Sequence, residues 1–308
     1  MKNFPLTLLN LFNSMNVSKE RNIEVGGYSL PADFQCITTA FLSSLQDMAY
    51  GDRIKAIYKK ILGAELPENA FSSLEDAEFP ASVVSIDQGL AVLELFDGAS
   101  ANYTDYIVNE SKQSEIVSLT ATFISSYVDL VTGGVINLGD SINLAINGED
   151  GRVLLSAYFS KKVGLPIETI LVGLEKPISD VIKGVYFESP LDGDLTTLIS
   201  GLYDELDYLL DPLSTYGLVS YDLYYADYDD DRVTLLTCLA SPYLYSRQVL
   251  KHAFSVNEIS IDKAIKTLNM LTGIEVPSRI ENKTVQPYFK INSKLSYKDA
   301  IEIIKGQK

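Results

Sequence analysis

The sequence predicts an α/β fold of three layers, in which a parallel or mixed sheet is covered by helices on both faces. Short β-rich runs alternate along the chain with segments whose apolar residues recur at helical spacing. The β-rich runs lack the two-residue alternation of a strand with one wet face, and this is typical of strands buried on both sides. A chain of 308 residues that is 46% apolar and 21% charged can bury the core that such layers need.

Five runs rich in branched and apolar residues are the strand candidates. Each is six to eight residues long, within the usual length of a buried strand. The runs span residues 91–96, 116–121, 141–146, 168–173 and 232–239.

Three segments of the chain carry helical signals. Apolar residues recur at helical spacing from Ile54 to Leu62, and Gly63 follows where a helix end favours a left-handed residue. A second helix is predicted from Val153 to Val163, closed by Gly164 and Pro166. The third has its apolar residues on one stripe, formed by Leu195, Leu198, Ile199, Leu202, Leu206 and Leu209.

Composition excludes several classes of function. The chain has 41 acidic and 25 basic residues and a net charge of -16, so this acidic protein would repel a nucleic acid, and we expect no such partner. Two cysteines, Cys36 and Cys238, cannot form a disulfide framework or a four-thiolate zinc site. The single histidine, His252, has no ligand partner at suitable spacing, so we expect no metal site.

The sequence also predicts that the protein is cytoplasmic and does not contact a membrane. Asn10, Asn13 and Asn16 interrupt the apolar stretch that a secretory signal requires. No run of about eighteen apolar residues is present that could span a bilayer.

Three polar or aromatic features admit two interpretations each. The acidic run at 227–231 could gather oxygen ligands for calcium, but it lacks the glycine and distal glutamate of a calcium loop and favours a solvated turn. His252 is interpreted as a structural or surface residue rather than a ligand. The tyrosines at 221–228 and 243–245 favour mixed packing with one wet edge, with a partner-binding surface as the alternative.

The segment that joins the third strand candidate to the second helix has the layout of an anion cradle. Gly148 and Gly151 would let backbone N–H groups face a phosphate at the positive end of the helix. Glu149 and Asp150 stand among those donors. A carboxylate about 4 Å from a phosphate opposes it by about 1 kcal/mol in water, against about 0.3–1 kcal/mol from the helix terminus, unless Arg152 offsets it. In the other interpretation both carboxylates satisfy the helix N-terminus themselves.

Seven blocks of the sequence carry a family resemblance. They are GGYSLPADF at 26–34, LELFDGASANYTD at 93–105, INGEDGR at 146–152, SKKVGLP at 160–166, ESPLDGDLTTLISGLYDEL at 188–206, YLLDPLSTYG at 208–217 and LLTCLASPYLYS at 235–246. In this order they resemble bacterial threonine synthases, which use pyridoxal phosphate (PLP) to convert O-phosphohomoserine to threonine. The resemblance implies PLP fold type II, shared with the tryptophan synthase β subunit. It also implies an N-terminal segment at 1–80 and a shortened core at 81–308, with the cofactor lobe largely lost between 106 and 146.

Carried over position by position, the family's site is degenerate. Thr104 stands at the Schiff-base lysine, and a threonine has no amine with which to form an aldimine. Cys238, or alternatively Leu239, stands where a hydroxyl lies near the pyridine nitrogen, and Asp97 and Leu213 replace two family histidines. The family's phosphate loop, close to SGNFG, is matched by Asn147, Gly148, Glu149, Asp150 and Gly151.

We therefore expect a threonine synthase-like pseudoenzyme that has lost PLP binding and catalysis. It would have a binding or regulatory role toward an unknown protein or small-molecule partner, with no cofactor. The alternative is an active PLP-dependent lyase acting on O-phosphohomoserine, with a relocated lysine such as Lys112 or Lys161. A third hypothesis is a hydrolytic or lyase activity that uses Asp97 and Asp105 near Glu149.

Overall fold

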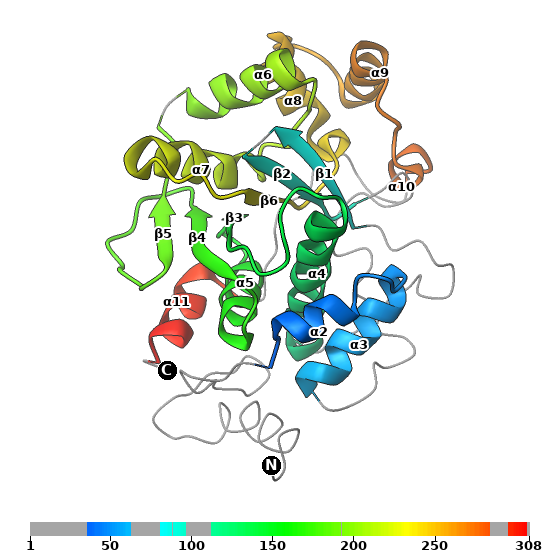
Figure 1. Ribbon diagram of the computed structural model, residues 1–308. Helices are drawn as coiled ribbons and strands as arrows, with labels where there is room; N and C mark the ends of the chain where they lie inside the picture. Colours follow the sequence, from blue (N-terminus) through cyan, green and yellow to red (C-terminus); the bar gives the residue numbers. More distant parts are fainter. Residues whose placement is uncertain are drawn as a thin grey trace.

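A computed structural model describes residues 36–62, 81–87, 89–96, 112–191, 193–283 and 295–306 of the chain. In this part of the chain a sheet of six strands has the order β1-β2-β6-β3-β4-β5 (Figure 1). The strands are β1 (Ser82–Asp87), β2 (Leu90–Glu94), β3 (Ile142–Asn147), β4 (Ile167–Gly173), β5 (Val185–Glu188) and β6 (Thr234–Cys238). β1 is antiparallel to β2, and every other neighbouring pair is parallel. The predicted mixed α/β sheet is therefore confirmed.

Helices cover both faces of this sheet, as predicted (Figure 1). On one face α4 (Lys112–Thr132) and α5 (Gly151–Val163) share a core with α2 (Thr39–Ser44), α3 (Tyr50–Leu62) and α11 (Tyr297–Lys305). The other face is covered by α6 (Asp194–Leu206) and α7 (Thr215–Tyr228). A separate cluster adjoins this second face and joins the 3₁₀ helix η3 (Pro242–Tyr245), α8 (Ser246–Phe254), α9 (Ile261–Thr272) and α10 (Ser278–Glu281). Of the helices described, none has the length and apolar character required to cross a membrane.

Most of the predicted elements occur where the sequence placed them. Four of the five strand candidates correspond to β2, β3, β4 and β6, and the three helical segments correspond to α3, α5 and α6. Gly164 ends α5 in the left-handed conformation with φ of 109°, as its position predicted. The strands β1 and β5 at the two ends of the sheet were not predicted. The division at residue 80 stays a prediction, and residues 63–80 lie outside the described residues.

The prediction of a strand at 116–121 is wrong, because these residues lie inside the long helix α4. The run resembles a strand locally, but α4 is buried from Ile116 to Val128 on all sides, so no polar face marks it as a helix. Two of its hydroxyls form hydrogen bonds within the helix rather than with solvent: Thr122 donates to Ser118 O at 2.9 Å and Ser126 donates to Thr122 O at 2.8 Å. The proposed loss of a lobe between 106 and 146 stays a prediction; α4 and most of β3 lie within that interval.

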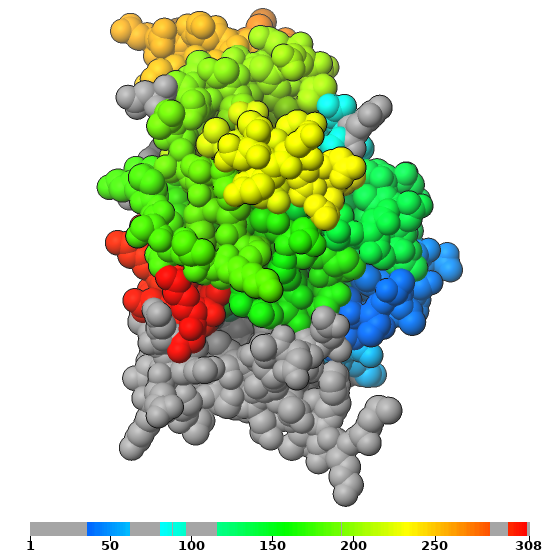
Figure 2. Space-filling model, turned by 60° about the vertical axis from the view of Figure 1, so that its left-hand side comes forward, coloured from blue at the N-terminus to red at the C-terminus, as the bar shows by residue number. Residues whose placement is uncertain are grey.

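The first half of α7 packs directly on the sheet because two glycines allow close approach. A Cβ atom on Gly173 would overlap the carbonyl group of Tyr216 and lie 2.9 Å from the nitrogen of Gly217. A Cβ atom on Gly217 would lie 2.9 Å from Leu236 and 3.1 Å from the backbone of Ile146. This contact places the turn before α7 against the carboxyl ends of β3 and β6. The second half of α7 and the turn that follows it lie at the molecular surface, in yellow in Figure 2.

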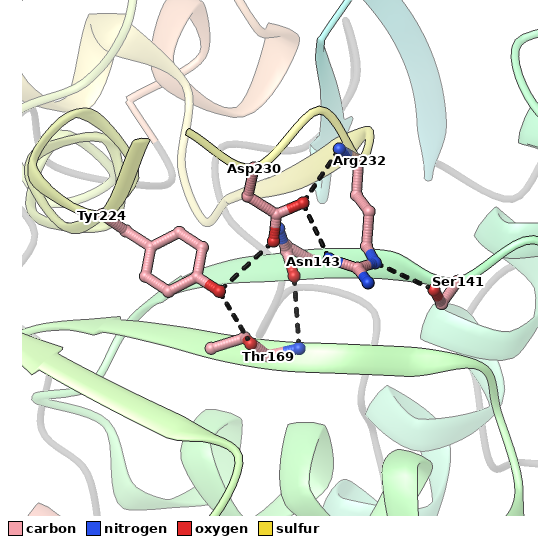
Figure 3. Close-up of polar contacts among 6 residues, drawn as sticks. All are labelled: Ser141, Asn143, Thr169, Tyr224, Asp230 and Arg232. Carbon is pink, nitrogen blue, oxygen red and sulfur yellow. Dashed lines mark hydrogen bonds and ion pairs between the residues drawn. The ribbon is translucent and has the colours of Figure 1, made fainter. Parts of the chain in front are cut away.

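At the opposite end of the strands, the acidic run forms a structured turn rather than a calcium loop. Asp229 ends α7 in the left-handed conformation, and the Asp230 side chain is buried. Figure 3 shows that Asp230 accepts hydrogen bonds from Asn143 Nδ2 at 3.1 Å and Tyr224 Oη at 3.2 Å, and pairs with Arg232 at 2.9 Å. Within the described residues, no group of acidic, histidine or cysteine side chains could hold a metal ion.

This turn gives a pH-dependent stability that can be measured. Burial raises the pKa of Asp230, but hydrogen bonds from Asn143 and Arg232 outweigh it and hold the pKa below its usual value. The contribution of Asp230 is therefore present above the unfolded pKa near 4 and is lost as the pH falls through the lower folded pKa. We expect Asp230→Asn to lower the free energy of unfolding by about 1 kcal/mol at neutral pH, with the loss shrinking below about pH 4. Urea denaturation of both variants at several pH values measures this effect. The control variant Asp231→Asn, at the exposed neighbouring position, should have the wild-type free energy of unfolding at every pH.

Candidate functional site

The candidate site lies at the edge of the sheet where the parallel strands end, the edge at which α/β proteins usually bind ligands. Asn147 ends β3 and Cys238 ends β6, and each lies two residues beyond the paired residues Ala145 and Leu236. The structure therefore brings together the predicted phosphate loop and the predicted pyridine-nitrogen position. Thr104, at the predicted Schiff-base position, lies outside the described residues, as do Asp97 and Asp105.

The loop after β3 is closed by hydrogen bonds within the chain. The N–H of Gly148 donates to the carbonyl of Gly173 at 2.8 Å, and the N–H of Glu149 donates to Asn147 Oδ1 at 2.8 Å. The Glu149 carboxylate accepts from the N–H of Glu175 at 2.7 Å, so it faces the end of β4 and does not cap the helix. Two N–H groups that would face a phosphate in an anion cradle are thus engaged.

Asp150 is the residue that caps α5. Its carboxylate accepts from the N–H of Arg152 at 3.0 Å and from the Arg152 guanidinium at 2.9 and 2.6 Å. The Asp150 side chain is 0% exposed and that of Arg152 is 9% exposed. Because Arg152 is committed to this bidentate pair, it does not offset the loop's negative charge toward a ligand. One of the two interpretations of the loop, the self-capped helix, therefore describes Asp150 but not Glu149.

Leu295 and Ser296, near the C-terminus, contact the N-terminal end of α5. Gly151 donates its N–H to the carbonyl of Leu295 at 3.1 Å, and Asp150 forms an antiparallel bridge with Ser296. A Cβ atom on Gly151 would overlap the carbonyl oxygen of Ser296 and lie 2.8 Å from that of Leu295. The approach that only a glycine permits at this position is therefore made by the chain's own backbone.

Cys238 points into the layer of α6 and α7 and is fully buried. Its thiol donates to Asp211 Oδ2 at 3.4 Å. Burial, and then the neighbouring Asp211 and Glu94 carboxylates, raise the pKa of Cys238 well above its usual value. The sulfur is therefore held as a neutral thiol, which is a poor nucleophile.

Asp211 organises the turn that faces both strand ends. Its buried carboxylate accepts from the N–H groups of Leu213 at 2.9 Å and Ser214 at 3.1 Å, and from the Ser214 hydroxyl. The same Ser214 hydroxyl accepts from the N–H of Leu239 at 3.0 Å, and Asn147 Nδ2 donates to Leu213 O at 2.7 Å. This turn therefore links the ends of β3 and β6 by hydrogen bonds.

A tyrosine and a glutamate extend this buried polar group toward β2. Tyr208 donates to Glu94 Oε1 at 2.7 Å, and Ser82 donates to Glu94 Oε2 at 3.1 Å. Burial, and then Cys238 and Glu94, raise the pKa of Tyr208 well above its usual value. Tyr208 and Asp211 lie in the YLLDP block, but their roles were not predicted. The signal was present, because two polar side chains flank two leucines in a buried stretch.

The two lysines considered as relocated Schiff-base residues lie in different places. Lys161 is ten residues from Gly151 along α5, about 15 Å away along the helix axis, and its ammonium donates to the carbonyl of Glu168. Burial lowers the pKa of Lys161. Lys112 begins α4, and its side chain lies outside the described residues. The structure therefore separates Lys161 from the phosphate loop.

The remaining candidate, His252, has a structural contact. It lies on α8, and its Nδ1 is 2.7 Å from Thr196 Oγ1 on α6. Burial, and then the charge of Lys251, lower the pKa of His252. This histidine therefore links α8 to α6 and is not among the residues at the strand ends.

Comparison with solved structures identifies the fold. The chain is similar to PLP-bound threonine synthase from Brucella melitensis, with a TM-score of 0.57, 10% identity, and coverage of 88% of this chain and 92% of that chain. For threonine synthase from Escherichia coli the values are 0.59, 11%, 84% and 91%, and for the yeast enzyme 0.60, 13%, 92% and 92%. No protein-family model and no curated protein sequence matches the chain. The chain has the fold of threonine synthases, as the sequence blocks predicted.

Proposed function

We propose that this chain is a threonine synthase-like protein that neither holds PLP nor makes threonine, and that it acts by binding a partner. The observation that carries the proposal is the closed loop 147–151. The N–H groups of Gly148, Glu149, Gly151 and Arg152 all donate to acceptors of the same chain. A phosphate at this position would have to replace each of these acceptors.

The residues of the loop do not fit a PLP phosphate. A phosphate beside Asp150 would compete with a buried, bidentate ion pair, and separating that pair leaves a buried charge without a partner at a cost of about 3–5 kcal/mol. The helix terminus returns only about 0.3–1 kcal/mol for an anion. On this balance the loop is more stable closed by its own side chains than opened around a phosphate.

The position matched to the pyridine nitrogen gives independent support. The Cys238 thiol donates to Asp211 inside the α6–α7 layer and is fully buried there. A group at this depth offers no hydrogen bond to a ring lying outside the sheet edge. The position matched to the phosphate and the position matched to the ring therefore both support the proposed loss of PLP binding.

Incubation with PLP, followed by borohydride reduction, tests this proposal. We expect no visible absorbance band from bound PLP after gel filtration. We also expect no lysine to carry a phosphopyridoxyl group in one-to-one yield, as measured by intact mass and peptide mapping. Threonine synthase from Escherichia coli serves as the positive control. Low, scattered labelling of exposed lysines, equal in unfolded protein, would be non-specific and agrees with the proposal.

The alternative, a PLP enzyme with a relocated lysine, makes the opposite prediction. One lysine, Lys112 or Lys161, would be labelled stoichiometrically, and Lys112→Ala or Lys161→Ala would abolish the bound colour. Either result would disprove the proposed loss of the cofactor. Thermal unfolding with inorganic phosphate adds a readout that needs no lysine, and we expect no rise in Tm.

A further inference from the structure

The second half of α7 is an uncovered aromatic surface. The first half is buried on the sheet through Thr215, Gly217, Leu218, Val219 and Ser220, whereas residues 222–229 are exposed except for Tyr224. Tyr225 is 50% exposed and Tyr228 is 60% exposed. Figure 2 shows this part of the helix in yellow at the centre of one face. Large exposed aromatic side chains gathered on one helix end are typical of interaction surfaces rather than of helix termini in general.

The rings of this surface form two groups. Tyr228 packs against Tyr224, with ring centroids 4.7 Å apart, and against Tyr186 of the edge strand β5, with centroids 5.9 Å apart. Tyr221 and Tyr225 lie one turn away with centroids 6.1 Å apart. Because the rings support one another, the exposed faces of Tyr225 and Tyr228 are already ordered before a partner arrives, and this lowers the entropy cost of binding.

The surroundings of these rings are acidic. Residues 221–232 contain five aspartates and one arginine. That arginine, Arg232, pairs with Asp230 and donates to Ser141, so its charge is directed to the turn (Figure 3). Asp222, Asp227, Asp229 and Asp231 are exposed.

Two carboxylates on this surface share one donor. Tyr186 Oη lies 3.1 Å from Glu188 Oε1 and 3.1 Å from Asp227 Oδ2. A tyrosine hydroxyl carries one proton and can donate to only one of them at a time. Burial and the two carboxylates raise the pKa of Tyr186, so the proton stays on the hydroxyl. Among the described residues, no cation forms an ion pair with Glu188 or Asp227.

We propose that the projecting half of α7, with the neighbouring edge of β5, binds an arginine-containing basic segment of another protein. The inference rests on the proposed function, since it names the partner class of a binding protein. Charge complementarity requires a cation, and the chain's net charge of -16 opposes nucleic acids and anionic lipid surfaces. Arginine fits better than lysine because a guanidinium stacks on a tyrosine face while it donates to a carboxylate.

Fluorescence anisotropy with labelled peptides tests the inference on the full chain at physiological salt. The probes are an alternating arginine–glycine peptide, its lysine–glycine counterpart, and a glutamate–glycine peptide of equal length. We expect the arginine peptide to bind more tightly than the lysine peptide and the glutamate peptide not to bind. Tyr225→Ala with Tyr228→Ala should weaken the arginine peptide about five- to thirtyfold, whereas Tyr225→Phe with Tyr228→Phe should retain wild-type affinity.

A matched pair of charge variants separates this surface from general attraction to an acidic protein. Asp222→Asn, Asp229→Asn and Asp231→Asn remove three exposed charges from the second half of α7 and the turn that follows it, and should weaken binding. Asp204→Asn, Glu205→Gln and Asp207→Asn remove three exposed charges at the end of α6 and should not. Asp229 and Asp207 each end a helix in the left-handed backbone conformation, which asparagine also tolerates.

Three outcomes would overturn the inference. Equal weakening by the two charge variants, or equal affinity for arginine and lysine peptides without loss in the alanine variant, would show attraction by net charge alone. A dimer that the alanine variant dissociates would make a second copy of this chain the occupant. None of these results changes the PLP measurement, so failure of this inference and failure of the proposed function are distinguishable.

Discussion

Gly173→Ala, which adds a single methyl group, is expected to lower the free energy of unfolding by at least about 3 kcal/mol. The added Cβ atom would overlap the Tyr216 carbonyl and approach the nitrogen of Gly217. These are backbone atoms of α7, so no side-chain rotation can relieve the overlap. Either β4 or the start of α7 must move, and the start of α7 follows directly on the turn that is hydrogen-bonded to the ends of β3 and β6.

The matched control is Gly201→Ala. Gly201 lies inside α6, and a Cβ atom there would meet nothing within 4 Å. The same methyl group should therefore raise stability by about 0.4–1 kcal/mol, because alanine loses less conformational entropy than glycine in a helix. Urea denaturation of both variants measures the two effects. Equal stabilities for Gly173→Ala and wild type would contradict the close α7–sheet contact.

Asp211→Ala is expected to cost about 3–5 kcal/mol in the free energy of unfolding. The buried carboxylate accepts from two N–H groups, the Ser214 hydroxyl and the Cys238 thiol, and an alanine leaves them without an acceptor. Each orphaned buried donor costs about 1–3 kcal/mol, and partial relaxation keeps the sum below the simple total. Asp204→Ala, at an exposed position on α6, should stay within about 0.5 kcal/mol of wild type.

The pH dependence of Asp211 has the opposite sign to that of Asp230. Burial raises the pKa of Asp211 despite the hydrogen bonds from Ser214 and Cys238 that lower it. The folded pKa exceeds the unfolded one, so the contribution of Asp211 is complete below about pH 4 and is lost as the pH rises through the folded pKa. The stability of wild type relative to Asp211→Asn should therefore fall as the pH rises above about 4. A rise over that range would contradict the buried, proton-retaining carboxylate.

The order of strands in this sheet shows where prediction from the sequence stops. β2 and β6 are direct neighbours although about 140 residues separate them in the chain, and their pairing joins Glu94 to Cys238. Apolar runs identify each strand separately, but hydrogen-bonded pairing between distant runs leaves no local pattern. For the same reason the hydrogen bonds from Tyr208 to Glu94 and from Cys238 to Asp211 were not predicted, whereas Cys238 was singled out through the sequence blocks.

The sequence by itself determined the alternation of strands and helices, the glycine end of α5, and the position of the loop 147–151. Each depends on residues adjacent along the chain, where spacing and backbone preference act directly. Only the tertiary structure decided that Leu295 accepts from Gly151 and that Glu149 turns toward Glu175. These outcomes depend on which distant backbone groups packing brings within about 3 Å, since hydrogen bonds act only at short range.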